Sequence, residues 1–194
     1  MTQSTNEEWL SWIETQKKAT EIWFAGDIAA AIELIGHYLS QSRPLDLSRQ
    51  AIAFRGDLHE ESGNLEIARA SYLAARELSE KPDYERYTLE LSLGSVAEKL
   101  GDRRSAGAWY LRALETAFLD GTTSGGSALL RLLELRVEQG LSEEERQLAE
   151  NVVRQSWRLL GVEGEPSLED LRRAARKLIE AQGRPRPPKI GPNQ

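Results

Sequence analysis

Two segments of the chain repeat one spacing of small and aromatic residues. Each segment places two glycines, an alanine, a tyrosine and a second alanine at relative positions 0, 7, 12, 16 and 19. The matched residues are Gly56, Gly63, Ala68, Tyr72 and Ala75 in one segment, and Gly94, Gly101, Ala106, Tyr110 and Ala113 in the other. Small residues allow two antiparallel helices to cross closely, the second glycine closes the turn, and the aromatic ring fills the remaining space. The stretch from Arg49 to Asp120 therefore predicts two consecutive helix pairs.

This skeleton resembles the tetratricopeptide repeat (TPR) family, in which the same residue types follow one another at the same spacings. The resemblance implies an all-α fold, a short right-handed helical solenoid of TPR-like helix hairpins with a C-terminal capping helix. It does not identify the partner that such a solenoid binds.

Four turn glycines extend the pattern beyond these two copies. Gly26, Gly63, Gly101 and Gly140 are separated by 37, 38 and 39 residues. The outer copies are degenerate, with Ile35 and Tyr38 in place of tyrosine and alanine in the first and Glu145 in place of alanine in the fourth. We therefore expect the second helix of the fourth unit to pack differently. The predicted units are 6–44, 48–82, 84–120 and 127–160.

The predicted helices follow from apolar periodicity and from capping signals. They span 5–24, 28–41, 48–62, 64–80, 84–100, 102–119, 127–139 and about 142–160, with Pro44 ending the second. A last helix over 168–182 would cover the exposed end of the core, so the repeat domain is predicted to span 1–182. The segment 183–194 contains four prolines and is predicted to be a disordered tail rich in proline and arginine.

Composition narrows the possible classes of protein. A chain of 194 residues with 40% hydrophobic and 29% charged residues suits one soluble helical domain. No apolar run is long enough for a transmembrane helix and no signal peptide is recognised, so we expect a cytoplasmic protein without a membrane partner. The absence of cysteine excludes disulfides and thiolate metal sites. The net charge is −6, with a basic segment after residue 164 and an acidic body before it.

In TPR proteins the first helix of each pair lines a concave groove that binds partners. By register, the resemblance implies groove positions in all four units: Gln16, Thr20 and Trp23; Ala53, Asp57, Glu60 and Glu61; Leu91, Ser95, Glu98 and Lys99; and Leu130, Glu134, Val137 and Glu138. Nine of them are the candidate partner-binding residues. They are Thr20, Trp23, Asp57, Glu60, Glu61, Ser95, Glu98, Glu134 and Glu138. Six acidic residues accompany one basic residue, Lys99, so the groove is predicted to attract a basic peptide or protein surface. The alternative is that these carboxylates form an ordinary solvated face.

Other kinds of site have little support in the sequence. The groove positions Ala53, Asp57, Ser92 and Ser95 are not basic, so a TPR site that clamps a C-terminal carboxylate is not expected. We predict no catalytic residue, no metal site and no cofactor. The basic C-terminal segment is interspersed with acidic residues and lacks an aromatic platform, so nucleic acid is not an expected partner. The basic tail could instead visit the protein's own groove.

The sequence therefore predicts a non-catalytic protein–protein interaction module, acting as an adaptor or assembly chaperone for a basic segment. A dedicated inhibitor, such as an immunity protein that neutralises a toxin or nuclease, is the alternative. A regulator of transcription or signalling is a second alternative. The sequence leaves the oligomeric state open.

Overall fold

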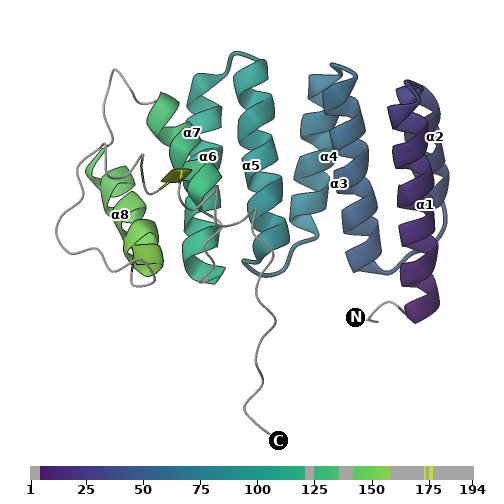
Figure 1. Ribbon diagram of the computed structural model, residues 1–194, viewed down its shortest axis with the longest axis horizontal. Coiled ribbons are helices and arrows are strands. Elements are labelled where there is room, and N and C mark those ends of the chain that lie inside the picture. Colours follow the sequence, from purple (N-terminus) through teal and green to yellow (C-terminus); the bar gives the residue numbers. More distant parts are fainter. Residues whose placement is uncertain (1–4, 121–124, 136–141, 158–172, 174, 177–194) are drawn as a thin grey trace, which may run out of the picture.

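The chain forms a row of antiparallel helix pairs in a computed structural model that describes residues 5–120, 125–135, 142–157, 173 and 175–176. Figure 1 shows the pairs standing side by side along the long axis, with the N-terminal pair at one end and α8 at the other. The described helices are α1 (Asn6–Phe24), α2 (Ile28–Leu39), α3 (Leu45–Glu61), α4 (Leu65–Glu77), α5 (Tyr84–Lys99), α6 (Arg103–Asp120), α7 (Gly126–Leu135) and α8 (Glu143–Trp157). The fold is an all-α solenoid, as predicted.

The core runs along the solenoid as three hydrophobic clusters, each of which includes residues of successive helices. The first joins α1, α2 and α3 around Trp12, whose indole N–H donates to Gln50 Oε1 at 3.0 Å. The second joins α4 and α5 around Tyr72 and Leu93. The third joins α5, α6, α7 and α8 and includes Tyr110. Because each pair covers the apolar face of its neighbour, no single pair could bury this surface alone.

Local signals in the sequence set most helix ends. Thr5 and Glu8 form a capping box at the start of α1, and Asp27 caps α2 through the backbone N–H of Ala30 at 3.0 Å. The turn glycines Gly26, Gly63 and Gly101 have φ angles of 93°, 77° and 79°, a left-handed conformation that favours glycine.

The start of α3 differs from the prediction. α2 ends at Leu39, two residues before the predicted end at 41, and α3 begins at Leu45, three residues before the predicted position. Pro44 immediately precedes the first turn of α3, and its carbonyl accepts a hydrogen bond from the backbone N–H of Ser48 at 2.9 Å. Proline suits this place because its fixed φ is compatible with a helix start and the N–H it lacks would have no helical partner.

The two central pairs are held by a tyrosine ring lying against a helix glycine. A Cβ atom added to Gly56 would lie 2.7 Å from Cε1 of Tyr72, closer than real Cβ contacts allow. Gly94 and Tyr110 repeat this contact in the next pair. Both rings are buried, with exposed fractions of 1% and 0%. The glycines are therefore required by the close approach of the rings and not by the helices that contain them.

The fourth unit departs from this arrangement, as expected. Ser142 and Glu145 form the predicted capping box of α8: the backbone N–H of Ser142 donates to Glu145 Oε2 at 2.8 Å, and that of Glu145 donates to Ser142 Oγ at 3.2 Å. Among the described residues, α8 packs mainly against α6, whereas the two helices of each earlier pair pack against each other. Of the predicted capping helix, only residues 173, 175 and 176 are described, and Ala175 is buried in the third cluster. The predicted tail lies outside the described residues.

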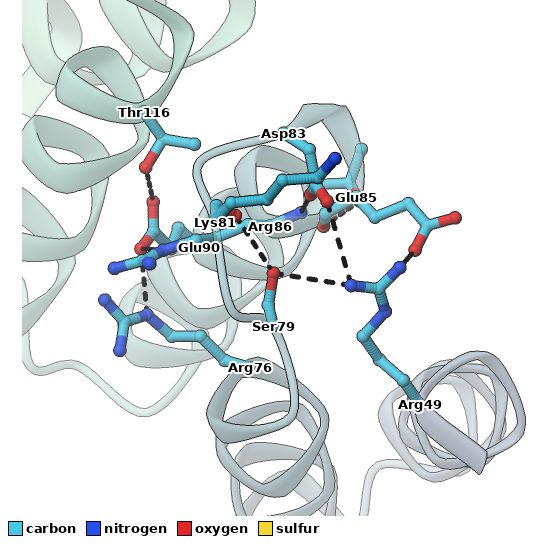
Figure 2. A network of polar contacts seen from close by, with 10 residues as sticks. Arg49, Arg76, Ser79, Lys81, Asp83, Glu85, Arg86, Glu90 and Thr116 are labelled. Atoms are coloured by element: carbon cyan, nitrogen blue, oxygen red, sulfur yellow. Dashed lines mark hydrogen bonds and ion pairs between the residues drawn. The ribbon is translucent and has the colours of Figure 1, made fainter. Parts of the chain in front are cut away.

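A buried carboxylate connects three helices between the second and third pairs. Glu90 of α5 is fully buried and accepts hydrogen bonds from Arg76 Nε of α4 at 2.8 Å, Arg86 Nε at 3.2 Å and Thr116 Oγ1 of α6 at 2.6 Å (Figure 2). A buried carboxylate needs such partners because its desolvation is costly. This network fixes how α4, α5 and α6 meet.

A second network beside it joins α3 to the start of α5. Arg49 of α3 forms ion pairs with Asp83 at 3.7 Å and with Glu85, and it donates to Ser79 Oγ at 3.4 Å (Figure 2). The Arg49 side chain is largely buried by these contacts. The two networks together hold the second pair against the third.

The glycine–tyrosine contact predicts a stability difference between two glycine substitutions. Gly56→Ala should lower the free energy of unfolding by about 1–3 kcal/mol, because the added methyl group overpacks against the Tyr72 ring. Gly36→Ala in α2 is the matched control, since an added Cβ there meets nothing within 4 Å. It should be neutral or stabilising by up to about 1 kcal/mol through helix propensity. Urea unfolding measures both, and equal effects of the two substitutions would contradict the packing account.

Candidate functional site

Two recesses lie on the surface formed by α1, α3, α5 and α7, the first helices of the four pairs, which we call the first-helix face. The N-terminal recess has a volume of about 270 Å³ and lies between α1, α3 and α5. The second, of about 500 Å³, lies between α3, α5 and α7. Of the predicted groove positions, Gln16, Ala53 and Asp57 line the first recess, and Glu60, Leu91, Ser95, Leu130 and Glu134 line the second. Of the nine candidate partner-binding residues, Asp57, Glu60, Ser95 and Glu134 line a recess, whereas Thr20, Trp23, Glu61 and Glu98 line neither.

The Tyr72 hydroxyl lies between two carboxylates of this face. Its oxygen is 2.7 Å from Asp57 Oδ1 and 2.8 Å from Glu60 Oε2. A phenol carries one proton, so it can donate a good hydrogen bond to only one of the two carboxylates at a time. Burial, followed by the charge of Asp57 and the hydrogen bonds to both carboxylates, raises the pKa of Tyr72, so the hydroxyl keeps its proton.

Asp57 is the carboxylate that this arrangement perturbs most clearly. Its side chain reaches solvent, but the helices around the recess remove much of its water. Desolvation raises the pKa of Asp57 to about 6, against a lowering by the Tyr72 hydrogen bond, and Glu60 and Glu61 add to the increase. A cation entering the recess would favour the ionised form of Asp57.

Glu60 is more firmly held than the sequence indicates. It accepts hydrogen bonds from Ser95 Oγ at 3.1 Å and Lys99 Nζ at 2.8 Å in addition to Tyr72, so it joins α3 to α5. The equivalent residue of the next pair is Glu98, which accepts a hydrogen bond from Tyr110. Each tyrosine thus reaches the glutamate twelve residues before it. That constant spacing was present in the sequence and could have identified the pairing.

The other candidate residues have different surroundings. Thr20 is half-buried and its hydroxyl donates to the backbone carbonyl of Gln16 at 2.8 Å. Trp23 stacks on Phe24 with ring centroids 5.4 Å apart and contributes to the N-terminal cluster. Glu61 is exposed, and Glu134 forms an exposed ion pair with Arg131 at 3.3 Å. Glu138 lies outside the described residues.

Two cations on this face were missed by the sequence reasoning. They are Arg49, which lines the N-terminal recess beside Glu85, and Arg131, which lines the second recess. The expected ratio of six acidic residues to one basic residue therefore overstates the charge imbalance. Arg49 lies one helical turn before Ala53, so extending the register by four residues would have found it.

Pairing within the protein leaves the face acidic nevertheless. Each of the three cations contacts at least one carboxylate: Arg49 pairs with Asp83 and Glu85, Lys99 with Glu60, and Arg131 with Glu134. Asp57 and Glu61 have no cationic partner within the described part of the chain. In the same part of the chain, no group of three or more His, Asp or Glu residues is arranged to hold a metal ion. None of the described helices is both long and apolar enough to cross a membrane.

The raised pKa of Asp57 predicts a pH-dependent effect of Asp57→Asn. Its folded-state pKa, about 6, lies above the ordinary value of 3.8, so the stability that protonation provides is complete below about pH 4 and is lost as the pH rises through 6. The asparagine variant has no such loss. Between pH 4 and pH 7 its stability should therefore rise relative to wild type, by about 1 kcal/mol because solvent at the exposed side chain reduces the full effect. Denaturant unfolding across this pH range measures the difference, and parallel profiles for the two proteins would contradict it.

Comparisons with known proteins support the fold. No protein-family model matches the chain, and no curated protein matches it. The crystal structure of BtubC (BKLC) from P. vanneervenii is similar, with a TM-score of 0.60 and 17% sequence identity, covering 91% of this chain and 83% of that one. A Podosopora anserina chain described as having nearly identical TPR-like repeats overlaps at a TM-score of 0.45 with 11% identity, covering 89% of this chain and 96% of its own. The protein has a TPR-like helical repeat fold.

Proposed function

We propose that this chain is a non-catalytic protein-binding module whose first-helix face receives a basic segment of a partner protein. The observation that supports the proposal is the uneven pairing on this face. Arg49, Lys99 and Arg131 already contact carboxylates of the same protein, whereas Asp57 and Glu61 have no cationic partner among the described residues. A lysine or arginine of a partner would supply the missing positive charge.

The shape and charge of the recesses favour a cation over an anion. The N-terminal recess combines Asp57 and Glu85 with the apolar side chains of Ala53 and Leu89, so it can accept both the stem and the charged head of a basic side chain. Arg49 and Lys99 already form ion pairs with carboxylates of this chain, and carboxylates outnumber cations in the lining of each recess, so an anionic group would meet a net negative charge. The same reasoning supports the expectation that a carboxylate clamp is absent from this face.

Within this function we propose a role as an adaptor or assembly chaperone that holds a basic client segment. An inhibitor that covers the basic site of a toxin or nuclease would use the same surface, and the identity of the partner distinguishes these roles. The absence of cysteine fits a reducing compartment, so the proposal includes a cytoplasmic location.

The binding proposal is tested with a fluorescein-labelled hexalysine peptide and fluorescence anisotropy. The double variant Asp57→Asn and Glu61→Gln should bind the peptide at least tenfold more weakly than wild type, which corresponds to about 1.4 kcal/mol. Raising the salt concentration from about 50 mM to about 500 mM should also weaken binding, because the Debye length falls from roughly 14 Å to roughly 4 Å.

The matched control is Glu33→Gln with Glu77→Gln, which removes two exposed carboxylates from the second helices α2 and α4. It changes the net charge by the same amount but should leave the peptide affinity within twofold of wild type. Equal weakening by both double variants would show attraction to the overall charge and would contradict a site on the first-helix face. Absence of saturable binding at low salt would contradict the proposal as well.

A further inference from the structure

A third recess, of about 170 Å³, lies where α4, α5 and α6 meet and is lined by three arginines. Arg76 comes from α4, Arg86 from α5 and Arg112 from α6. The carboxylates that also line it are the buried Glu90 and the exposed Glu115. The recess therefore carries a net positive charge in a chain whose total charge is −6.

This recess opens on the side of α5 that faces away from the first-helix face. Thr88 and Ser92 of α5 line the recesses of the first-helix face, whereas Arg86 and Glu90 line the arginine recess. Residues two apart on an α-helix point in nearly opposite directions. The arginine recess is therefore separate from the acidic face and has the opposite sign of charge.

The arginines retain hydrogen-bond donors after their contacts within the protein are counted. Arg76 and Arg86 both direct Nε to the same oxygen of Glu90, and Thr116 occupies its other oxygen (Figure 2). Each guanidinium has five N–H donors, so the Nη groups of both arginines remain for another acceptor. Arg112 stacks over the Trp109 ring at 4.8 Å and has no ion pair with a carboxylate in the described residues.

The surroundings of the recess hold these donors in place. The buried Glu90 forms ion pairs with both Arg76 and Arg86. The guanidinium of Arg76 also lies over the Trp109 ring, 5.5 Å from its centroid. The side chains of Arg76 and Arg86 are only 22% and 27% exposed, so they lose little further conformational freedom when a ligand binds. Guanidinium groups bind planar and tetrahedral oxyanions through paired N–H donors, which a flexible lysine does less well.

We infer that the recess formed by Arg76, Arg86 and Arg112 is an oxyanion-binding site that takes a phosphate or a carboxylate group. Glu90 orients two of the arginines, and Arg112 forms no ion pair with a carboxylate within the described residues. The site binds its ligand independently of the acidic face. With both sites in use, this chain would bind a basic segment on the first-helix face and an anionic group in the arginine recess.

The inference is tested on the full chain by titrating sodium phosphate, and separately glutarate, at an ionic strength held constant with NaCl. The readout is the ¹H–¹⁵N NMR signal of the Trp109 indole, whose ring is in contact with the guanidinium groups of both Arg76 and Arg112. Arg112→Gln leaves the contacts of Glu90 intact and should weaken binding at least fivefold. Arg104→Gln removes an exposed arginine of the same helix outside the recess and should change binding less than twofold.

Saturable shifts with either probe that Arg112→Gln removes and Arg104→Gln preserves would support the site. A response to phosphate alone would identify a phosphate group as the ligand of the recess. A response to glutarate as well would show that the recess also binds carboxylates such as acidic side chains. Shifts that NaCl reproduces, or equal weakening by the two variants, would overturn the inference. Because neither variant alters the first-helix face, failure here would leave the hexalysine result unaffected.

Discussion

The contact between a tyrosine ring and a helix glycine is the constraint on which the rest of this structure depends. Tyr72 and Tyr110 can approach the backbones of α3 and α5 this closely only because Gly56 and Gly94 have no Cβ atom. The same two side chains carry their hydroxyls to the first-helix face, where they bind Asp57, Glu60 and Glu98. One residue type therefore packs the solenoid and also positions the carboxylates of its candidate binding surface.

The outer pairs show what happens when the tyrosine is absent. At the positions of Gly56 and Tyr72 the first pair has Ala19 and Ile35, both fully buried, so a larger residue on one helix accompanies a smaller one on the other. Trp23 stands where the central pairs have a glutamate, and it packs against the N-terminal cluster. In the last unit the corresponding residues are Leu133 and Ala149, also buried. Within the described residues, the tyrosine-bound carboxylates of the face therefore belong to the two central pairs.

Spacing in the sequence was sufficient to predict the first three helix pairs and the turn glycines Gly26, Gly63 and Gly101, whereas Gly140 lies outside the described residues. It placed Asp57, Ser95 and Glu134 beside the recesses because helical register fixes direction as well as position. The spacing could not show that Lys99 and Ser95 donate hydrogen bonds to Glu60, or that Glu85 forms an ion pair with Arg49. In each case the two partners come from different helices. Glu145 in place of alanine indicated that α8 packs differently, but its packing mainly against α6 depends on tertiary contacts that the spacing did not predict.

The most direct test of this account is an NMR titration of the Asp57 carboxyl carbon in wild type and in Tyr72→Phe, which keeps the ring and removes the hydroxyl. The account predicts a pKa of about 6 for Asp57 in wild type and a higher value in the variant, because the hydrogen bond from Tyr72 stabilises the carboxylate. An Asp57 pKa near the ordinary value of 3.8 in both proteins would contradict it. That result would mean that the tyrosine packs the helices without organising the binding face.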